Sequence, residues 1–296
     1  MAPFFVHQNF LDYLSHEKRF SGHTCTAYRK DLEQFFEFAE ILHENDLKEV
    51  SSRLVRGWMV DLMDNHYEAV SVNRKLSTLR TYFKWLKREG KIQTNPMSLV
   101  KGPKVSKTIP SFVQQGKLQK ENIEPLFSDD FDGVRDHLMF EMLYQTGMRL
   151  SELIGLQNTD VRPDHIKVLG KRNKERLIPI SKELFEQVKA YRIMRQELDE
   201  KSPFFFLLNT GKKVYPKFVY RKINNYLGRA TDMKKKSPHV LRHTFATQML
   251  NNGAGLEVLK ELLGHANLSA TQVYTHNSFA KLTSIYSQSH PRGRQK

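Results

Sequence analysis

Apolar residues recur at helical spacing through the first hundred positions, and this pattern predicts four helices. The first begins at Phe10, Leu11 and Leu14. The second carries the apolar series Tyr28, Leu32, Phe35, Phe36 and Ala39. A third covers about 52–63. The fourth begins after Ser71, a suitable N-cap, and stops at Gly90, a suitable residue to follow a C-cap.

The fourth predicted helix separates apolar from basic side chains. At 100° per residue, one face collects Leu76, Leu79, Tyr82, Phe83 and Leu86. The opposite side collects Arg80, Lys84, Lys87 and Arg88. Residues 71–107 hold ten Lys and Arg against one acid, Glu89, a surplus of nine (10 − 1). A solvated helix face normally mixes charge signs, so we expect this face, with Arg74, to follow a phosphate backbone.

A change in composition after Gly90 predicts a domain boundary. Residues 91–118 contain Pro96, Pro103 and Pro110 among several lysines, and proline disfavours helix at itself and at the residue before it. We expect a helical domain over 1–103, an extended basic linker over 104–112 and a second domain over 113–296. Such a linker is either a passive connection or a segment that wraps around a duplex.

The second half predicts a mixture of helices and a hairpin. Residues 134–146 are helical and end at Gly147, and a short helix follows with Arg149 or Ser151 near its start. The segments HIKVLG and ERLIPI, separated by KRNK, predict two strands of a hairpin. Helices dominate again from Lys182, and residues 278–287 form a last amphipathic segment that either caps its own domain or docks on a neighbouring protomer. The expected fold is mainly α with a small β-sheet.

Charge narrows the choice of partner. The chain has 47 Lys and Arg against 32 Asp and Glu, a formal charge of +15, and a pI near 9.7. This balance favours an extended polyanion, nucleic acid first, over a charge that serves only solubility. A single cysteine, Cys25, excludes an internal disulfide and is more typical of a packed residue than of a nucleophile. Neither a signal peptide nor a membrane-spanning run is evident, so we expect a soluble, cytoplasmic protein without a membrane partner.

Metal chemistry fits the sequence poorly. We find no compact cluster of Asp and Glu, no Walker loop and no CxxC pair. His239 and His243 have the i, i+4 spacing of zinc ligands on a helix, but the glutamate of HExxH is missing and Arg242 lies between them. We therefore expect no metal and no cofactor.

Four polar segments point instead to a known family. They are TGMRLSELIGL (146–156), GKRNKERLIPI (170–180), SPHVLRHTFATQML (237–250) and LLGHANLSATQVYTH (262–276). In these segments, and in their order and separation, the chain resembles the tyrosine recombinases, in particular the bacterial Xer-type enzymes related to lambda-type phage integrases. The resemblance covers nearly the whole chain. It implies a two-domain DNA clamp with a helical core-binding domain and a mixed α/β catalytic domain.

The resemblance also implies six catalytic residues, matched position by position: Arg149, Lys171, His239, Arg242, His265 and Tyr274. All six hold residue types that the family uses. A lesser difference, Gln248 where a histidine is frequent, lies outside this set.

Physical chemistry gives the cationic members of this set clear tasks. Most arginines are salt-bridge or helix-end residues, but two guanidinium groups, those of Arg149 and Arg242, can clamp the non-bridging oxygens of one phosphate in place of a metal. Lys171, in a hairpin turn that also holds Arg172 and Lys174, is placed to protonate the departing 5′-oxygen.

The remaining members concern the nucleophile. His239 follows Ser237-Pro238, a good helix start, and its ordinary pKa near 6.5 suits accepting the proton that Tyr274 must lose. His265 is expected to hydrogen-bond a phosphate oxygen, and His243 to be structural. The resemblance implies that Tyr274 forms a 3′-phosphotyrosyl bond and leaves a free 5′-hydroxyl.

Three functions remain open from the sequence. The first is Xer-type recombination of double-stranded DNA by a tetramer on paired sites, resolving chromosome dimers with a paralogous recombinase and a septal DNA translocase. The second keeps the chemistry in the integrase of a mobile element or in a topoisomerase-like nicking and closing enzyme. The third is a DNA-binding protein without catalysis, which the intact set of six residues disfavours.

Overall fold

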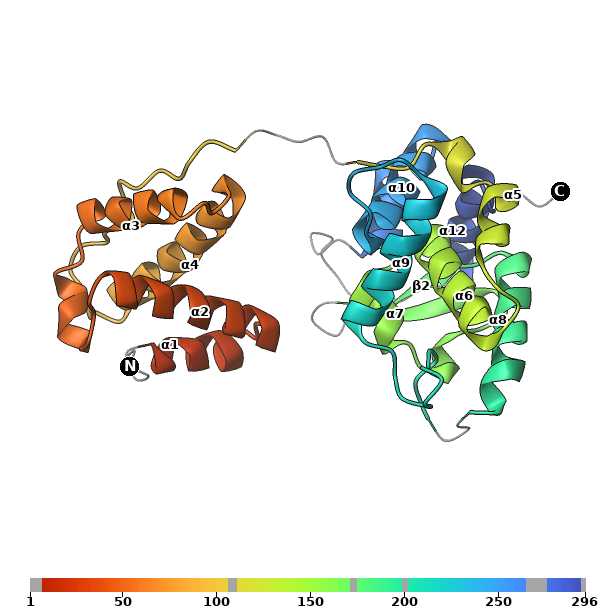
Figure 1. The fold of residues 1–296 in the computed structure, drawn as a ribbon, viewed down its shortest axis with the longest axis horizontal. Coiled ribbons are helices and arrows are strands. Elements are labelled where there is room, and N and C mark those ends of the chain that lie inside the picture. The colour runs from red at the N-terminus through yellow and green to blue at the C-terminus, as the bar shows by residue number, and fades with distance from the viewer. Residues whose placement is uncertain (1–6, 106–110, 171–174, 199–201, 265–275, 294–296) are drawn as a thin grey trace. The chain divides into compact units, whose positions relative to one another are not determined.

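The computed structural model describes residues 7–105, 111–170, 175–198, 202–264 and 276–293 (Figure 1). Contacts within the chain divide it into two compact units, Met1–Thr108 and Ile109–Lys296. Each unit has its own hydrophobic core.

The first unit consists of helices around an aromatic core. In chain order these are α1 (Gln8–Asp12), the π-helical turn η1 (Tyr13–Glu17), α2 (Gly22–Phe38), the 3-10 turn η2 (Glu44–Lys48), α3 (Ser52–Asp64) and α4 (Ala69–Arg88). Phe10, Phe35, Trp58 and Tyr82 are fully buried where the helices meet. The four predicted helices are confirmed, the first continuing as a π-turn.

The two ends of α4 differ in how well the sequence predicts them. The predicted start after Ser71 is wrong, because the extended residue Glu68 is the N-cap and its carbonyl accepts the first helical bond, from the N–H of Val72. The predicted end is confirmed, since Gly90 follows the C-cap with φ +71°. All five residues of the predicted apolar face are fully buried: Leu76, Leu79, Tyr82, Phe83 and Leu86.

The second unit is built around one central helix, α6 (Phe131–Thr146). Every side chain of this helix from Leu138 onward is buried. Around it lie α7 (Leu150–Gly155), α8 (Lys182–Gln196), α9 (Pro216–Ala230), α10 (Pro238–Asn251), α11 (Leu256–Leu263) and α12 (His276–Ser289). Shorter turns complete the unit: η3 (Gln115–Leu118), α5 (Lys120–Ile123), η4 (Glu124–Leu126) and η5 (Asn158–Asp160).

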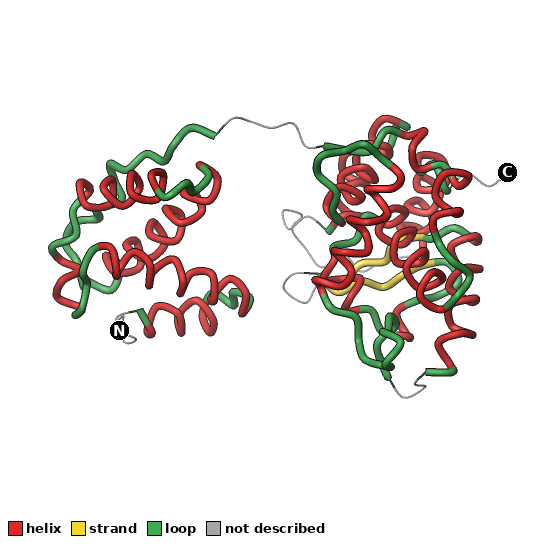
Figure 2. The backbone as a smooth tube through the Cα atoms, in the orientation of Figure 1, coloured by secondary structure: helices red, strands yellow, loops and turns green. Residues whose placement is uncertain are grey.

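The predicted hairpin is present. Strands β1 (His165–Leu169) and β2 (Glu175–Pro179) pair antiparallel, with His165 opposite Pro179 and Leu169 opposite Glu175. In the described part of the chain these two strands form a two-stranded sheet, which lies among the helices in Figure 2. The expectation of a mainly α fold with a small β-sheet is confirmed.

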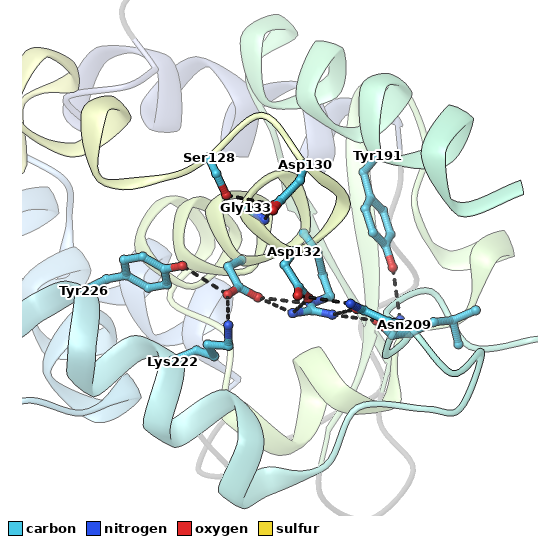
Figure 3. A network of polar contacts seen from close by, with 11 residues as sticks. Ser128, Asp130, Asp132, Gly133, Tyr191, Asn209, Lys222 and Tyr226 are labelled. Carbon is cyan, nitrogen blue, oxygen red and sulfur yellow. Dashed lines mark hydrogen bonds and ion pairs between the residues drawn. The ribbon is translucent and has the colours of Figure 1, made fainter. Parts of the chain in front are cut away.

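A buried ionic network ties α9 to the central helix. Arg135 of α6 has a side chain that is 1% exposed, and it pairs with Asp132 and Asp136 at 2.5 and 2.8 Å and donates to Asn209. The carboxylate of Asp136 also receives Lys222 and the hydroxyl of Tyr226, both from α9 (Figure 3). Since removing one partner would leave a buried charge unpaired, the network fixes the orientation of α9 on α6.

The C-terminal segment packs on its own unit. Leu282 and Tyr286 of α12 belong to the core of the second unit, and His290 beyond the helix is fully buried. Arg292 then pairs with the buried Glu141 of α6 at 2.8 Å. These contacts hold the segment on its own domain, and docking on a neighbouring protomer stays a prediction.

No helix in the described part of the chain combines the length and apolar character needed to cross a membrane.

Candidate active site and DNA interface

Arg149 is positioned by the turn between two helices. Gly147 ends α6 in the left-handed conformation, with φ +61°, and Arg149 then adopts an extended conformation as the N-cap of α7. A side chain at position 147 would collide with Phe245 and Leu263, so the close approach of these elements also requires glycine. The end of α6 at Gly147 therefore determines the position of the Arg149 backbone, from which the guanidinium extends.

Glu152 accepts hydrogen bonds from both the backbone and the side chain of Arg149. Its carboxylate accepts the backbone N–H of Arg149 at 2.7 Å, as the N3 glutamate of a capping box does, and accepts Nη1 of the Arg149 side chain, also at 2.7 Å. The other terminal nitrogen, Nη2, donates to the carbonyl of Gly264 at 3.2 Å. The Arg149 side chain nevertheless remains 27% exposed, so it can be reached from solvent.

Arg242 approaches the same place from α10. Its Nη1 donates to the carbonyl of Gly147 at 2.6 Å and its Nη2 to the carbonyl of Leu263 at 2.7 Å. Burial, followed by the charge of Arg149, lowers the pKa of Arg242 to about 10, which still leaves it charged at neutral pH. Arg149 and Arg242 thus donate to adjacent carbonyls, those of Gly264 and Leu263, at the end of α11.

The two described histidines of the third segment differ in setting. Pro238 occupies the first turn of α10 with Ser237 as its N-cap, as predicted, although the Ser237 side chain makes no capping bond. His239 lies in this first turn and is exposed. His243 is half-buried, and its ring meets the ring of Phe112 edge-on with the centroids 6.3 Å apart.

Three of the six predicted catalytic residues, Lys171, His265 and Tyr274, lie outside the described residues. The structure brings Arg149 and Arg242 together. In the sequence, Lys171 comes two positions after the end of β1, and His265 comes two positions after the end of α11.

Sequence reasoning missed two charged residues of this site. Arg176 on β2 is 5% exposed and binds both carboxylate oxygens of Glu152 through Nη1 and Nη2, at 3.0 and 2.8 Å. A signal for Arg176 existed, since it occupies an inward position in the alternation of the strand ERLIP. Glu152 was visible as the third residue after Arg149, the place of a capping-box carboxylate.

The basic face expected on α4 is only partly free. Lys84 and Lys87 are exposed. Arg74, half-exposed, forms two bonds of 2.5 and 2.7 Å to the buried Asp31. Asp31 also receives Lys75, so one of the lysines counted in the surplus is buried and paired within the protein.

The two remaining arginines of that face also have partners within the chain. Arg80 donates to the carbonyl of Val100 at 3.2 Å. Arg88 binds Glu89 and the hydroxyl of Tyr13. These bonds orient the arginines. Lys84 and Lys87 are exposed, and neither forms a hydrogen bond or ion pair with another described residue.

A second basic surface, on and after α9, was not predicted. Residues 211–237 hold nine Lys and Arg and one acid, Asp232. On α9 the exposed residues include Lys217, Arg221 and Arg229, and Lys234 and Lys235 follow in the next loop. The same count of charge signs that singled out 71–107 would have found this segment.

The described residues contain no group of three or more His, Cys, Asp or Glu side chains suited to a metal ion. Cys25 is half-buried and packs against the core of the first unit, as expected for a packed residue.

Comparison with known proteins agrees with this geometry. Residues 117–281 match the phage integrase family, and residues 8–90 match the phage integrase N-terminal SAM-like domain. A tyrosine recombinase XerC from Chlorobaculum tepidum is 36% identical, with 96% of this chain and 93% of the relative covered. Another XerC, from Thermodesulfovibrio yellowstonii, is 37% identical, with 97% and 96% covered.

Solved structures show the same fold. The XerH site-specific recombinase, in a post-cleavage complex with a palindromic difH substrate, matches with a TM-score of 0.72 and 22% identity, over 90% of this chain and 79% of that chain. The chain belongs to the phage integrase family. It is a XerC-like tyrosine recombinase, an enzyme of the class that performs site-specific DNA recombination.

Proposed function

We propose that this protein exchanges strands of double-stranded DNA by Xer-type recombination, with Tyr274 as the nucleophile and without a metal or other cofactor. The observation that carries the proposal is the convergence of Arg149 and Arg242 on the carbonyls of Leu263 and Gly264. Two guanidinium groups so close together supply, for one phosphate, the positive charge that a metal ion supplies in other enzymes.

The proposed reaction exchanges one phosphoester bond for another, so it needs no external energy source. The hydroxyl oxygen of Tyr274 attacks the phosphorus, a bond from phosphorus to this oxygen forms, and the bond to the 5′-oxygen breaks. His239 accepts the phenol proton and Lys171 gives a proton to the departing 5′-oxygen. The phosphodiester is kept as a 3′-phosphotyrosyl ester, and the 5′-hydroxyl of a second strand reverses the step. His265 donates to a phosphate oxygen throughout.

The organisation of the enzyme forms part of the same proposal. Residues 1–103 form the core-binding domain, 104–112 the linker and 113–296 the catalytic domain, and together they close around a duplex. Four protomers assemble on two paired sites, with a paralogous recombinase and a septal DNA translocase as partners in resolving chromosome dimers. The XerC relatives support this biology over that of a mobile-element integrase, since they are 36% and 37% identical over at least 93% of their own length.

The direct test is a covalent complex on a nicked suicide duplex, formed in the presence of a chelator. We expect an adduct with the wild type and none with Tyr274→Phe, which should still bind the duplex. Tyr67→Phe, at an exposed tyrosine of the first unit, is the matched control and should form the adduct normally. An adduct with Tyr274→Phe would assign the nucleophile to another residue. No adduct with the wild type on any recombination site of its source genome would exclude the proposed chemistry.

A second test addresses Lys171. Lys171→Ala should slow cleavage of a normal phosphate, and a 5′-bridging phosphorothioate should restore the rate, because sulfur leaves without a proton. A variant equally slow on both substrates would remove the general-acid assignment.

A further inference from the structure

The carboxylate of Glu152 is saturated with hydrogen bonds. One oxygen, Oε1, accepts Nη1 of Arg149 and Nη1 of Arg176, while Oε2 accepts the backbone N–H of Arg149 and Nη2 of Arg176. The Glu152 side chain is only 4% exposed, so these two arginines supply the bonds that water would otherwise supply.

Arg176 makes a further contact that Arg149 does not. Its Nε donates to the carbonyl of Leu262 at 2.8 Å. Its guanidinium also packs against Gly264, where an added Cβ would lie 3.0 to 3.2 Å from three Arg176 atoms. Arg176 therefore supports the same end of α11 whose carbonyls receive Arg149 and Arg242.

The charges of this cluster do not cancel. Arg149, Arg176 and Arg242 contribute three positive charges and Glu152 one negative charge, a formal +2. Burial would raise the pKa of Glu152, but the hydrogen bonds and charge of Arg176, together with the hydrogen bonds from Arg149, hold it below its ordinary value. Glu152 is thus an anion in a site built to bind another anion, and its charge competes with a phosphate for the arginines.

We propose that Arg176 is a positioning residue for the strand-transfer reaction: by occupying Glu152 from the side away from solvent, it leaves the charge of Arg149 available to the substrate phosphate. The proposal rests on the function proposed above, in which Arg149 binds the phosphate that is attacked. Arg176 itself is 5% exposed, so in this proposal it acts through Glu152 and not by contact with the substrate.

The consequence of losing Arg176 follows from the hydrogen bonds of Glu152. Without Arg176, two acceptor positions of Glu152 become free in a buried setting. Arg149 is already bound to the same carboxylate through Nη1 and its backbone N–H, so its guanidinium can turn to fill them. A bidentate pair of Glu152 with Arg149 would withdraw that guanidinium from the phosphate. The formal charge of the cluster falls from +2 to +1.

The experiment uses the full-length protein and two suicide duplexes, identical except that one carries a neutral methylphosphonate at the cleaved position. Arg176→Met should lower the rate of covalent-complex formation on the phosphate about 10- to 100-fold, as loss of an orienting partner does elsewhere. On the methylphosphonate the same variant should match the wild type, because less negative charge has to be stabilised there.

A charge-compensated variant sharpens the test. Glu152→Gln with Arg176→Met returns the formal charge to +2, and the side-chain oxygen of glutamine can still accept the backbone N–H of Arg149. We expect this double variant to recover most of the rate on the phosphate. A double variant no faster than Arg176→Met would overturn the proposal, as would an Arg176→Met defect of equal size on both substrates.

Two controls separate positioning from folding. Arg195→Met removes another 5% exposed arginine, one that binds carbonyls of residues 202–205 away from this cluster, and should leave the ratio of the two rates unchanged. Arg176→Lys keeps the charge and should lose less activity on the phosphate than Arg176→Met, and an equal loss would contradict the role of charge.

The failure of the proposed function and the failure of this proposal can be told apart. If the wild type forms no adduct on either duplex, the proposed function fails. If the wild type reacts and Arg176→Met reacts as fast on the phosphate, only the positioning role of Arg176 is refuted.

Discussion

Arg242 donates to the carbonyl of Gly147 at 2.6 Å, across 95 positions of sequence. Gly147 ends α6 with φ +61°, and the ring of Phe245, one turn after Arg242 in α10, lies where a side chain at position 147 would stand. A single glycine therefore ends α6, allows α10 to approach closely and accepts a hydrogen bond from the guanidinium of Arg242 through its carbonyl.

We predict that Gly147→Ala destabilises the second unit and slows covalent-complex formation. The new Cβ would lie 2.5 Å from Cδ1 of Phe245, and the positive φ adds strain, together costing about 1–3 kcal/mol. The two tryptophans, Trp58 and Trp85, both belong to the first unit, so circular dichroism should report an earlier transition while tryptophan fluorescence should not.

Gly155→Ala is the matched control for this substitution. A Cβ on Gly155, the last residue of α7, meets nothing within 4 Å, so unchanged or slightly higher stability is expected. Equal melting of the Gly147→Ala variant and the wild type would refute the close approach of α10 to Gly147.

Lys84 and Lys87 should contribute mainly to the salt dependence of DNA binding. Replacing both by alanine should reduce the magnitude of the slope of log K against log salt by about 0.9 for each phosphate that the protein no longer neutralises. The measurement is a titration of duplex DNA at several salt concentrations. Lys182→Ala with Lys189→Ala, two exposed lysines of α8, provides the control, and a similar change of slope in that variant would show that general charge rather than the α4 face is responsible.

Arg292 should anchor the C-terminal segment through Glu141. Arg292→Met leaves the Glu141 carboxylate, 3% exposed, without its cation, and breaking a buried pair from one side costs about 3–5 kcal/mol. Unfolding followed by circular dichroism should show the loss, and Glu141→Gln combined with Arg292→Met should restore much of it. A single variant as stable as the wild type would mean that the segment is held by its apolar contacts alone.

His290 should make the second unit sensitive to acid. Burial, with the charge of Arg292 acting in the same direction, lowers its pKa to about 3, whereas an unfolded histidine titrates near 6.5. The neutral ring accepts the backbone N–H of Arg292 through Nδ1 and stacks on Tyr286. Because the unfolded chain takes up the proton first, the stability that the neutral ring contributes is present above pH 6.5 and is lost as the pH falls toward 3.

The measurement is the free energy of unfolding of the wild type and of His290→Gln between pH 7 and pH 4. The difference between them should shrink by up to about 1.4 kcal/mol per pH unit below 6.5. Carboxylates that also titrate in this range are common to both proteins and cancel in the difference. A difference that does not change with pH would assign the acid sensitivity elsewhere.

Local pattern was enough for most of the elements. The helical periods, the hairpin around KRNK and the helix ends at Gly90 and Gly147 depend on neighbouring residues alone, since helix and strand repeats are short. The misplaced start at Ser71 shows the limit: a good capping residue does not begin a helix when the carbonyl of Glu68 already accepts the first bond.

The sequence by itself also determined the family, because four ordered segments carry it, and with the family came Arg149 and Arg242 as candidates. Only the tertiary structure decided what surrounds them. Glu152 and Arg176 are 24 positions apart, and Arg74 reaches Asp31 across 43, so no local period connects these pairs. Whether an arginine is free for DNA or already bound to a carboxylate depends on distances through space, and those are decided when the helices pack.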